Sequence, residues 1–358
     1  MRYGFLQVNG MVKELSIKKD KMNKKFNILS IDGGGIRGIF ASEYLAKLEQ
    51  KFKDQGKENW QIYQNFDLLA GTSTGGIIAL ALSLGIPAKE ISDLYKENAR
   101  KIFKPIWYRP FGLFKYKYER DYLEKIIKDK FSKNFGYDPR LNDCMIPTCI
   151  PIFDLQEGEP SILKTKHNPT FNRDYHLPAY MAALATSAAP TFFKPYTSEY
   201  IDLNGHVKHF RIKVDGGVFC NNPSLTAIFE AKKYFNKKLD EINLLSIGTG
   251  SQKFCDSNAK NKFGISYWIN TKRKRIIELL MQGQSQQVQN LTDLLKDQGL
   301  EYYRIDTTLD ANCNIELDET DSEKINILCE KASREFQKSG NNIVEVFRRD
   351  FVPVQVTI

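Results

Sequence analysis

The stretch FDLLAGTSTGGIIALAL, residues 66–82, decides the fold of this chain. Its first five residues form a short apolar run typical of a buried strand, the turn GTSTG follows at 71–75, and a helical apolar run continues to residue 84. A similar sequence precedes it, because FNILSI at 26–31 leads into DGGGIRG and then into the helical pattern IFASEYLAKLEQKF at 39–52. This alternation predicts an α/β fold with a largely parallel sheet and helices on its faces.

The rest of the chain extends this pattern and then changes. Strands are predicted within 145–155, 210–217 and 242–250, and a helix over 180–189 ends before Pro190. After about residue 255 the composition shifts towards Lys, Gln and Asn with long helical patterns, including 276–295. We therefore expect an N-terminal tail at 1–25, one domain at 26–250, and a helical C-terminal portion at 251–358 packed on the same domain.

Composition narrows the class of protein. The 358 residues carry 52 Lys and Arg against 43 Asp and Glu, a net charge of +9 that favours anionic partners such as phospholipid surfaces or nucleotides. A solvated, Lys-rich surface explains the same excess. No apolar stretch approaches the roughly 18 residues of a membrane-spanning helix. The N-terminus has no apolar signal region, and the six cysteines form no C-x-x-C pair. These features predict a cytoplasmic protein with reduced thiols and no metal site.

The turn GTSTG places a serine between a strand and a helix. The flanking Gly71 and Gly75 suit such a turn, because a side chain would clash in its tight backbone. The helix that follows directs free N–H groups and its positive dipole end at Ser73, which favours a developing oxyanion. We predict that Ser73 is a nucleophile.

The loop DGGGIRG, residues 32–38, allows two interpretations. Gly33, Gly35 and Gly38 have the spacing of a dinucleotide-binding fingerprint. That site also needs an acidic residue at the end of a second strand, but the local acids Asp54 and Glu58 lie in a polar segment. The missing acidic residue makes a nucleotide-binding module the less favoured function, and we keep it as the alternative.

Consecutive glycines also expose backbone N–H groups to an anion. Beside a nucleophilic serine, that anion is the oxygen of a tetrahedral intermediate, so we favour an oxyanion hole formed by Gly33, Gly34 and Gly35. Arg37 then steadies the loop or meets a phosphate.

The choice of base is restricted by the scarcity of histidines. The chain has four, all in polar, loop-like stretches where solvated side chains are expected: His167, His176, His206 and His209. None follows Asp215, so a Ser–Asp–His triad would have to use Asp154 with His176 or His209, which stays formally open.

Asp215 is the preferred base. It ends a predicted strand and precedes Gly216 and Gly217, where open α/β sheets place functional groups. To accept a proton from serine its pKa must rise, and burial is the usual cause. A simple Asp-Gly turn is the alternative explanation.

Four motifs, DGGGIRG, GTSTGG, ATSAAPTFF and DGG followed by NNP, occur in this order between about residues 26 and 250. With them the chain resembles the patatin-like phospholipases. The resemblance implies a three-layer α/β/α fold, a Ser73–Asp215 dyad instead of a triad, and an oxyanion hole at Gly33–Gly35. It also implies hydrolysis of phospholipid acyl esters without a cofactor. A scaffold protein with a vestigial site is a further, less favoured alternative.

The chain is also similar to bacterial phospholipases that cyclic nucleotides activate in antiphage defence. That similarity implies a cyclic-nucleotide activator and a cytoplasmic enzyme that binds the inner membrane peripherally when active. A homo-oligomer also fits, whereas a nucleic acid polymer is not an expected partner.

The segment 101–120 interleaves aromatic and cationic side chains. This mixture suits the boundary of an anionic membrane, although packing of the aromatics onto the domain explains it equally well. We predict a lid or membrane-docking element whose contacts include Trp107, Tyr108, Phe111 and Phe114. Replacing Trp107 and Phe111 by Ser should weaken hydrolysis of liposomes and spare a soluble ester.

Overall fold

The computed structural model describes residues 25–55, 60–106, 116–251, 264–268, 275–309 and 315–349. In these residues a central sheet of eight strands has the order β5-β6-β3-β2-β1-β7-β8, with β4 paired to β3. The strands are β1 (Phe26–Ile31), β2 (Leu68–Gly71), β3 (Thr148–Asp154), β4 (Glu159–Lys164), β5 (Tyr196–Ile201), β6 (Val207–Asp215), β7 (Ile242–Ile247) and β8 (Glu301–Ile305).

The sheet is mostly parallel, as the sequence predicts. Strands β3, β2, β1, β7 and β8 run in one direction, whereas β4, β5 and β6 add an antiparallel section beside β3. Both β1 and β2 are fully buried and mostly apolar, which is expected of parallel strands covered on both faces.

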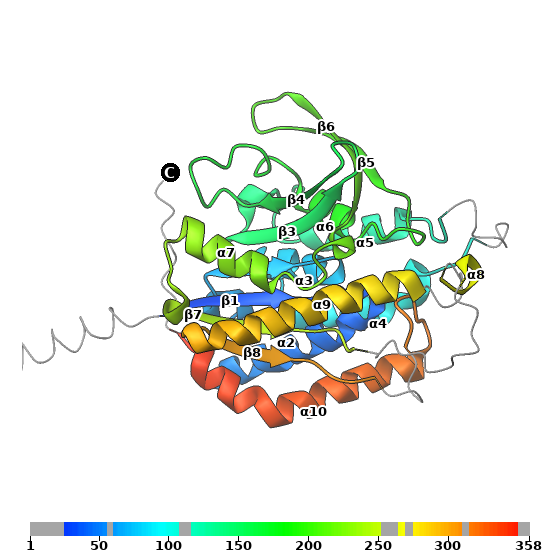
Figure 1. Ribbon diagram of the computed structural model, residues 1–358. Helices are drawn as coiled ribbons and strands as arrows, with labels where there is room; N and C mark the ends of the chain where they lie inside the picture. Colours follow the sequence, from blue (N-terminus) through cyan, green and yellow to red (C-terminus); the bar gives the residue numbers. More distant parts are fainter. Residues whose placement is uncertain are drawn as a thin grey trace, which may run out of the picture.

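Helices cover both faces of the sheet. They are α2 (Gly38–Asp54), α3 (Thr74–Ser83), α4 (Ala88–Ile102), α5 (Asp121–Ser132), α6 (Ala179–Thr186), α7 (Ser224–Tyr234), α8 (Ile265–Trp268), α9 (Arg275–Leu295) and α10 (Ser322–Phe347). Alternate residues of β1 enter different cores: Leu29 packs with α2, α3 and α10, and Ile28 packs with α7. Figure 1 shows α7 and α9 in front of the strands. The predicted three-layer α/β/α fold is confirmed.

The C-terminal portion differs from the sequence-based expectation of a helical segment. Residues Glu301–Ile305 form β8, which pairs in parallel with β7 at the edge of the central sheet. Helix α10 then packs along α2, where the Tyr44 hydroxyl lies 2.8 Å from Ser339 Oγ. The part of the chain after residue 250 thus completes the sheet as well as covering it.

The helices that the structure describes include none with both the length and the apolar character needed to cross a bilayer.

Candidate active site

Ser73 lies at a strained turn between β2 and α3. Its backbone has φ 54° and ψ −123°, a conformation that a non-glycine residue rarely adopts. The turn is also crowded, because a Cβ on Gly71 would lie 2.1 Å from the Gly75 carbonyl oxygen and one on Gly75 would lie 2.3 Å from that of Ile31. Only small residues fit here, and the strain directs the serine side chain away from the strand.

Asp215 contacts this serine directly. Ser73 Oγ donates to Asp215 Oδ2 at 2.7 Å, and Gly217 N donates to the other carboxylate oxygen, Oδ1, also at 2.7 Å. Both side chains are buried. The structure therefore brings together the two residues proposed for the dyad, which are 142 positions apart in the chain.

Sheet register explains why these residues meet. Leu69 and Ala70 of β2 pair in parallel with Thr148 and Cys149 of β3, so the turn at Ser73, which follows β2, lies beside the later residues of β3. One of these, Ile152, in turn pairs with Asp215, the last residue of β6. In open α/β sheets, functional groups gather at the carboxyl ends of parallel strands. Strand β6 is antiparallel to β3, so the position of the Asp215 carboxylate follows from this antiparallel pairing instead.

Burial raises the pKa of the Asp215 carboxyl into the range of a general base. Desolvation raises the pKa of its carboxyl from 3.8 to about 7, against the lowering effect of the hydrogen bonds from Ser73 and Gly217. No histidine is among the residues lining the cavity at Ser73. A carboxylate with this pKa can exchange a proton with the serine near neutral pH.

Thr186, at the end of α6, holds the serine backbone. Its Oγ1 accepts from Ser73 N at 3.0 Å and donates to the Pro151 carbonyl at 2.6 Å. The sequence analysis did not single out Thr186, although it lies within the motif ATSAAPTFF.

The glycine loop lies beside Ser73, and its N–H groups differ in whether they already donate a hydrogen bond within the protein. Gly33 N donates to the Asn221 carbonyl at 3.0 Å, so this group is already engaged. No described residue accepts from the N–H of Gly34 or Gly35, and Gly35 lines the same cavity as Ser73. Among the three glycines predicted as donors, the geometry favours Gly34 and Gly35.

A buried ion pair anchors the start of this loop. Arg304 of β8 donates to both oxygens of Asp32, at 3.1 and 2.7 Å, and also to Asp306 at 2.8 Å. Burial raises the pKa of Asp32 to about 6, although Arg304 acts to lower it. Sequence reasoning missed this contact, because β8 itself was not predicted.

The dinucleotide interpretation of the loop lacks its acidic residue. Asp54 ends helix α2 instead of a strand, and Glu58 lies outside the described residues. Gly38 begins α2, and Gly216 and Gly217 form the short helix η4 (Gly216–Val218) directly after Asp215.

An apolar cavity opens at Ser73. Besides Ser73, Asp215 and Gly35, it is lined by side chains from α3, α4, the segment after α6, and α9, including Ile77, Ile102, Phe103, Phe192, Phe193 and Met281. A cavity with this lining suits a hydrocarbon chain. Trp107, Tyr108, Phe111 and Phe114 lie outside the described residues, so the lid or membrane-docking element stays a prediction.

The histidines lie elsewhere. His176 Nδ1 accepts from Leu203 N at 3.2 Å, and His209 pairs with Glu199 at 2.6 Å. Asp154, the acid of the alternative triad, pairs with Lys213. The expectation of four solvated histidines is wrong for His176 and for His167, whose side chain is only 2% exposed.

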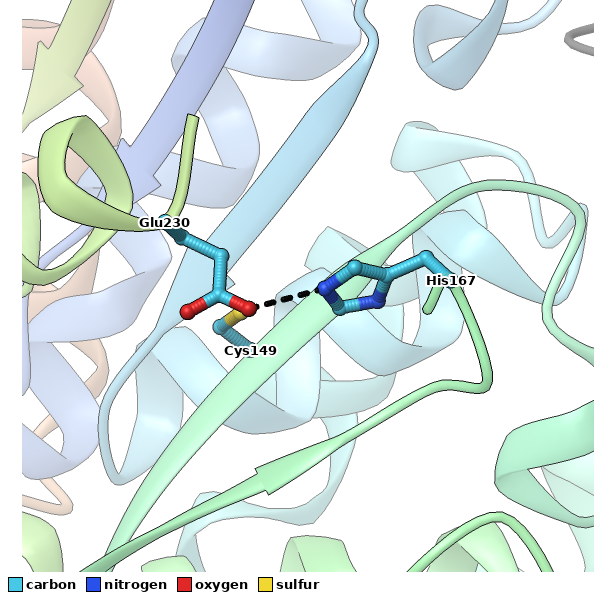
Figure 2. A group of neighbouring side chains, drawn as sticks. All are labelled: Cys149, His167 and Glu230. Carbon is cyan, nitrogen blue, oxygen red and sulfur yellow. Dashed lines mark hydrogen bonds and ion pairs between the residues drawn. The ribbon is translucent and has the colours of Figure 1, made fainter. Parts of the chain in front are cut away.

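His167 belongs to a buried cluster with Cys149 and Glu230, whose potential ligand atoms all lie within 4.8 Å of one another (Figure 2). His167 Nε2 lies 2.9 Å from Glu230 Oε1, and its Nδ1 lies 2.8 Å from Thr165 Oγ1. Lys164 Nζ occupies the second oxygen of Glu230 at 2.6 Å. Because a cation and two hydrogen bonds already satisfy these groups, we interpret the cluster as a structural network.

Comparisons with known proteins identify a family for this chain. The family model for patatin-like phospholipase matches residues 29–228. The chain is 34% identical over 246 residues to a cGAMP-activated phospholipase of Vibrio cholerae serotype O1, a match covering 66% of this chain and 67% of that protein. A cGAMP-activated phospholipase of Escherichia coli strain TW11681 is 34% identical over 64% of each chain.

Patatin-like protein 2 of Arabidopsis thaliana is 34% identical over 68% of this chain and 65% of its own length. The matches thus span about two thirds of the length of these curated relatives. Among solved structures, VipD from Legionella pneumophila has a TM-score of 0.42 and 11% identity, covering 89% of this chain and 67% of that chain.

Proposed function

The chain belongs to the patatin-like phospholipase family, and on this basis we propose that it hydrolyses the fatty-acyl ester bonds of membrane phospholipids with Ser73 as nucleophile and Asp215 as base. The observation that carries the proposal is the 2.7 Å hydrogen bond from Ser73 Oγ to Asp215 at the mouth of an apolar cavity.

In the acylation step, Asp215 takes the hydroxyl proton as Ser73 Oγ attacks the ester carbonyl carbon. The bond from Gly217 N to Asp215 Oδ1 keeps the carboxylate oriented, so that Oδ2 faces the serine. The carbonyl oxygen becomes an oxyanion, which the N–H groups of Gly34 and Gly35 and the N-terminal end of α3 stabilise. The proton then passes from Asp215 to the leaving lysophospholipid.

In the second step a water molecule, deprotonated by the same carboxylate, attacks the acyl-serine and releases the fatty acid. The acyl chain lies in the apolar cavity throughout, in contact with side chains such as Phe192 and Met281. This sequence of steps uses only groups of the protein and a water molecule.

The names of two relatives support a regulated version of this activity. Both the Vibrio and the Escherichia proteins are described as cGAMP-activated phospholipases. We extend the proposal to activation of this chain by a cyclic nucleotide in antiphage defence, with the active enzyme bound peripherally to the inner membrane as a homo-oligomer.

A fluorophosphonate probe tests the hydrolase. The wild-type protein should become covalently labelled, and Ser73→Ala should not. Ser187→Ala is the matched control, because Ser187 lines the same cavity but donates its hydroxyl to the Ala183 carbonyl at 2.7 Å instead of to an acid. Labelling should persist in that variant.

Product analysis with defined phospholipid vesicles, with and without cyclic dinucleotides, then identifies the released species. Absence of both labelling and fatty acid release under all conditions would rule out the enzyme and favour the nucleotide-binding module.

A further inference from the structure

A second cavity, polar in character, adjoins the site at Ser73. The glycine loop contributes to both cavities, Gly35 to the apolar one and Gly33 to the polar one, and Met281 of α9 borders both. The polar cavity is lined by side chains of several elements, including Arg37, Asn221, Gln286, Gln289, Arg304 and Asp306. The proposed reaction at Ser73 makes no use of these groups.

Arg37 is the most unusual residue of this cavity. Its side chain lies in the interior, with 9% of the residue exposed, yet its guanidinium Nε has no hydrogen-bond partner among the described residues. Burial lowers the pKa of this guanidinium, and the carboxylates of Glu278, Asp306 and Glu316 oppose that shift only through space. A buried arginine with unused donors is costly unless an anion binds it.

The neighbouring Arg304 differs from Arg37 because both of its terminal nitrogens donate to described residues, although its Nε has no partner among them. It donates to both oxygens of Asp32, to Asp306 and to Ser246 Oγ. The two acids closest to Arg304 are therefore already engaged in its ion pairs. The cationic group of the cavity left without a hydrogen-bonded anion, among the residues that the structure describes, is Arg37.

A further buried polar atom in the cavity is unsatisfied. Asn221 Oδ1 has no hydrogen-bond donor among the described residues, while its Nδ2 donates to Ser285 Oγ at 2.9 Å. The cavity thus presents a cation that lacks an anion and an acceptor that lacks a donor, both buried.

Helix α9 closes the cavity with amide side chains. Gln282, Gln286 and Gln289 line it, at the four- and three-residue spacing that places side chains on one face of a helix. An amide offers both a donor and an acceptor, and paired amide contacts match the hydrogen-bonding edge of a nucleobase. A phospholipid head group carries a phosphate but has no such edge.

We propose that this cavity binds a nucleotide through its phosphodiester, with Arg37 on the phosphate and the amide face of α9 on a base. The assignment deepens the proposed function and rests on it, because it gives the cyclic-nucleotide activator a binding site.

The position of the cavity couples it to the catalytic side chains. Gly33 N donates to the Asn221 carbonyl at 3.0 Å, and a Cβ on Gly33 would lie 3.2 Å from Ser73 Cβ. A ligand bound to Arg37 and Asn221 therefore contacts two segments at once. One is the glycine loop beside Ser73, and the other is the segment that follows Asp215. Hydrolysis should increase when the ligand binds.

Direct binding tests the site without reference to catalysis. Fluorescently labelled cGAMP is titrated with the full chain, and anisotropy gives the Kd. Removing the charge with Arg37→Gln should weaken binding roughly ten- to a hundredfold, since it deletes a charge-assisted hydrogen bond. Gln289→Glu, on the half-buried face of α9, should also weaken binding because a carboxylate can only accept hydrogen bonds, so the donor of the amide that contacts the base is lost.

The matched control is Arg334→Gln, which removes an arginine that is 69% exposed on α10 and should leave the Kd unchanged. Fluorophosphonate labelling of each variant reports whether the site at Ser73 still folds. Equal Kd values for wild type, Arg37→Gln and Gln289→Glu would overturn the assignment.

A lipid source of the phosphate gives a different pattern. Displacement of labelled cGAMP by glycerophosphoglycerol, or a raised KM for phospholipid with an unchanged Kd for cGAMP in Arg37→Gln, would identify a head-group site and overturn the nucleotide assignment. A wild-type protein that labels at Ser73 but binds no cGAMP would refute this inference and leave the hydrolase intact. A protein that binds cGAMP but does not label would refute the hydrolase instead.

Discussion

Replacing Asp215 by Asn should inactivate the protein and stabilise it at alkaline pH. The folded protein holds the carboxyl proton up to a pKa of about 7, whereas an aspartate in the unfolded chain has its ordinary pKa of 3.8. Between these two values the folded state binds more protons than the unfolded state, so this residue makes stability fall as the pH rises. Asn has nearly the same shape and no charge, and its Oδ1 can still accept from Gly217 N.

The magnitude follows from the shift of about three units. At 1.36 kcal/mol per unit, ionised Asp215 costs the folded state roughly 4 kcal/mol above about pH 7. For 358 residues at about 2.1 cal/mol/K each, this corresponds to an upper limit of roughly 5 °C in Tm. The gain of Asp215→Asn over wild type should therefore be near zero at about pH 4 and greatest at about pH 8.

Differential scanning calorimetry across this range measures the effect. Ser73→Ala is the informative control, because it should also be inactive. It removes a hydrogen bond that lowers the pKa of Asp215 and leaves the buried carboxyl in place, so this variant should gain no stability. Asp297→Asn, at an exposed position after α9, should be neutral at every pH. A pH-independent difference between Asp215→Asn and wild type would refute the burial argument.

Three further predictions concern the site and its support. The value of kcat/KM for a soluble ester should rise about tenfold per pH unit below about pH 7 and then level off as Asp215 ionises, and a flat profile from about pH 5 to 8 would contradict its role as base. Thr186→Val leaves the Ser73 N–H unpaired and should lower kcat by about ten- to a hundredfold, with recovery in Thr186→Ser. Arg304→Met leaves the buried Asp32 without its cation and should lower the free energy of unfolding, measured by chemical denaturation, by about 3–5 kcal/mol. Most of that loss should return when Asp32→Leu is added.

The sequence predicted the parts of the fold whose signal is local. The strands at β1 and β2, the turn at Ser73 and the helix after it all follow from apolar runs punctuated by glycine. Strand β8 was missed, because EYYRI lies in a region of polar helices and its partner β7 ends more than fifty residues earlier. Its ion pair with Asp32 was missed with it.

In the site, too, local motifs predicted the residues, whereas long-range pairing sets their geometry. Ser73 and Asp215 were identified as candidates from their motifs, but their distance depends on the register of three strands. The glycine motif likewise does not reveal which N–H groups stay unbonded, because the acceptor for Gly33 N comes from Asn221, far along the chain. Local pattern selects the chemistry, and long-range pairing decides which atoms are free to perform it.

The contact between Arg304 and Asp32 limits how far the protein can be shortened. The matched family segment ends at residue 228, well before β8. A truncated enzyme designed on that segment would keep Ser73 and Asp215 but would leave a carboxylate uncompensated at the base of the glycine loop. A minimal version for expression or engineering must therefore retain β8 together with β7, the strand that joins it to β1.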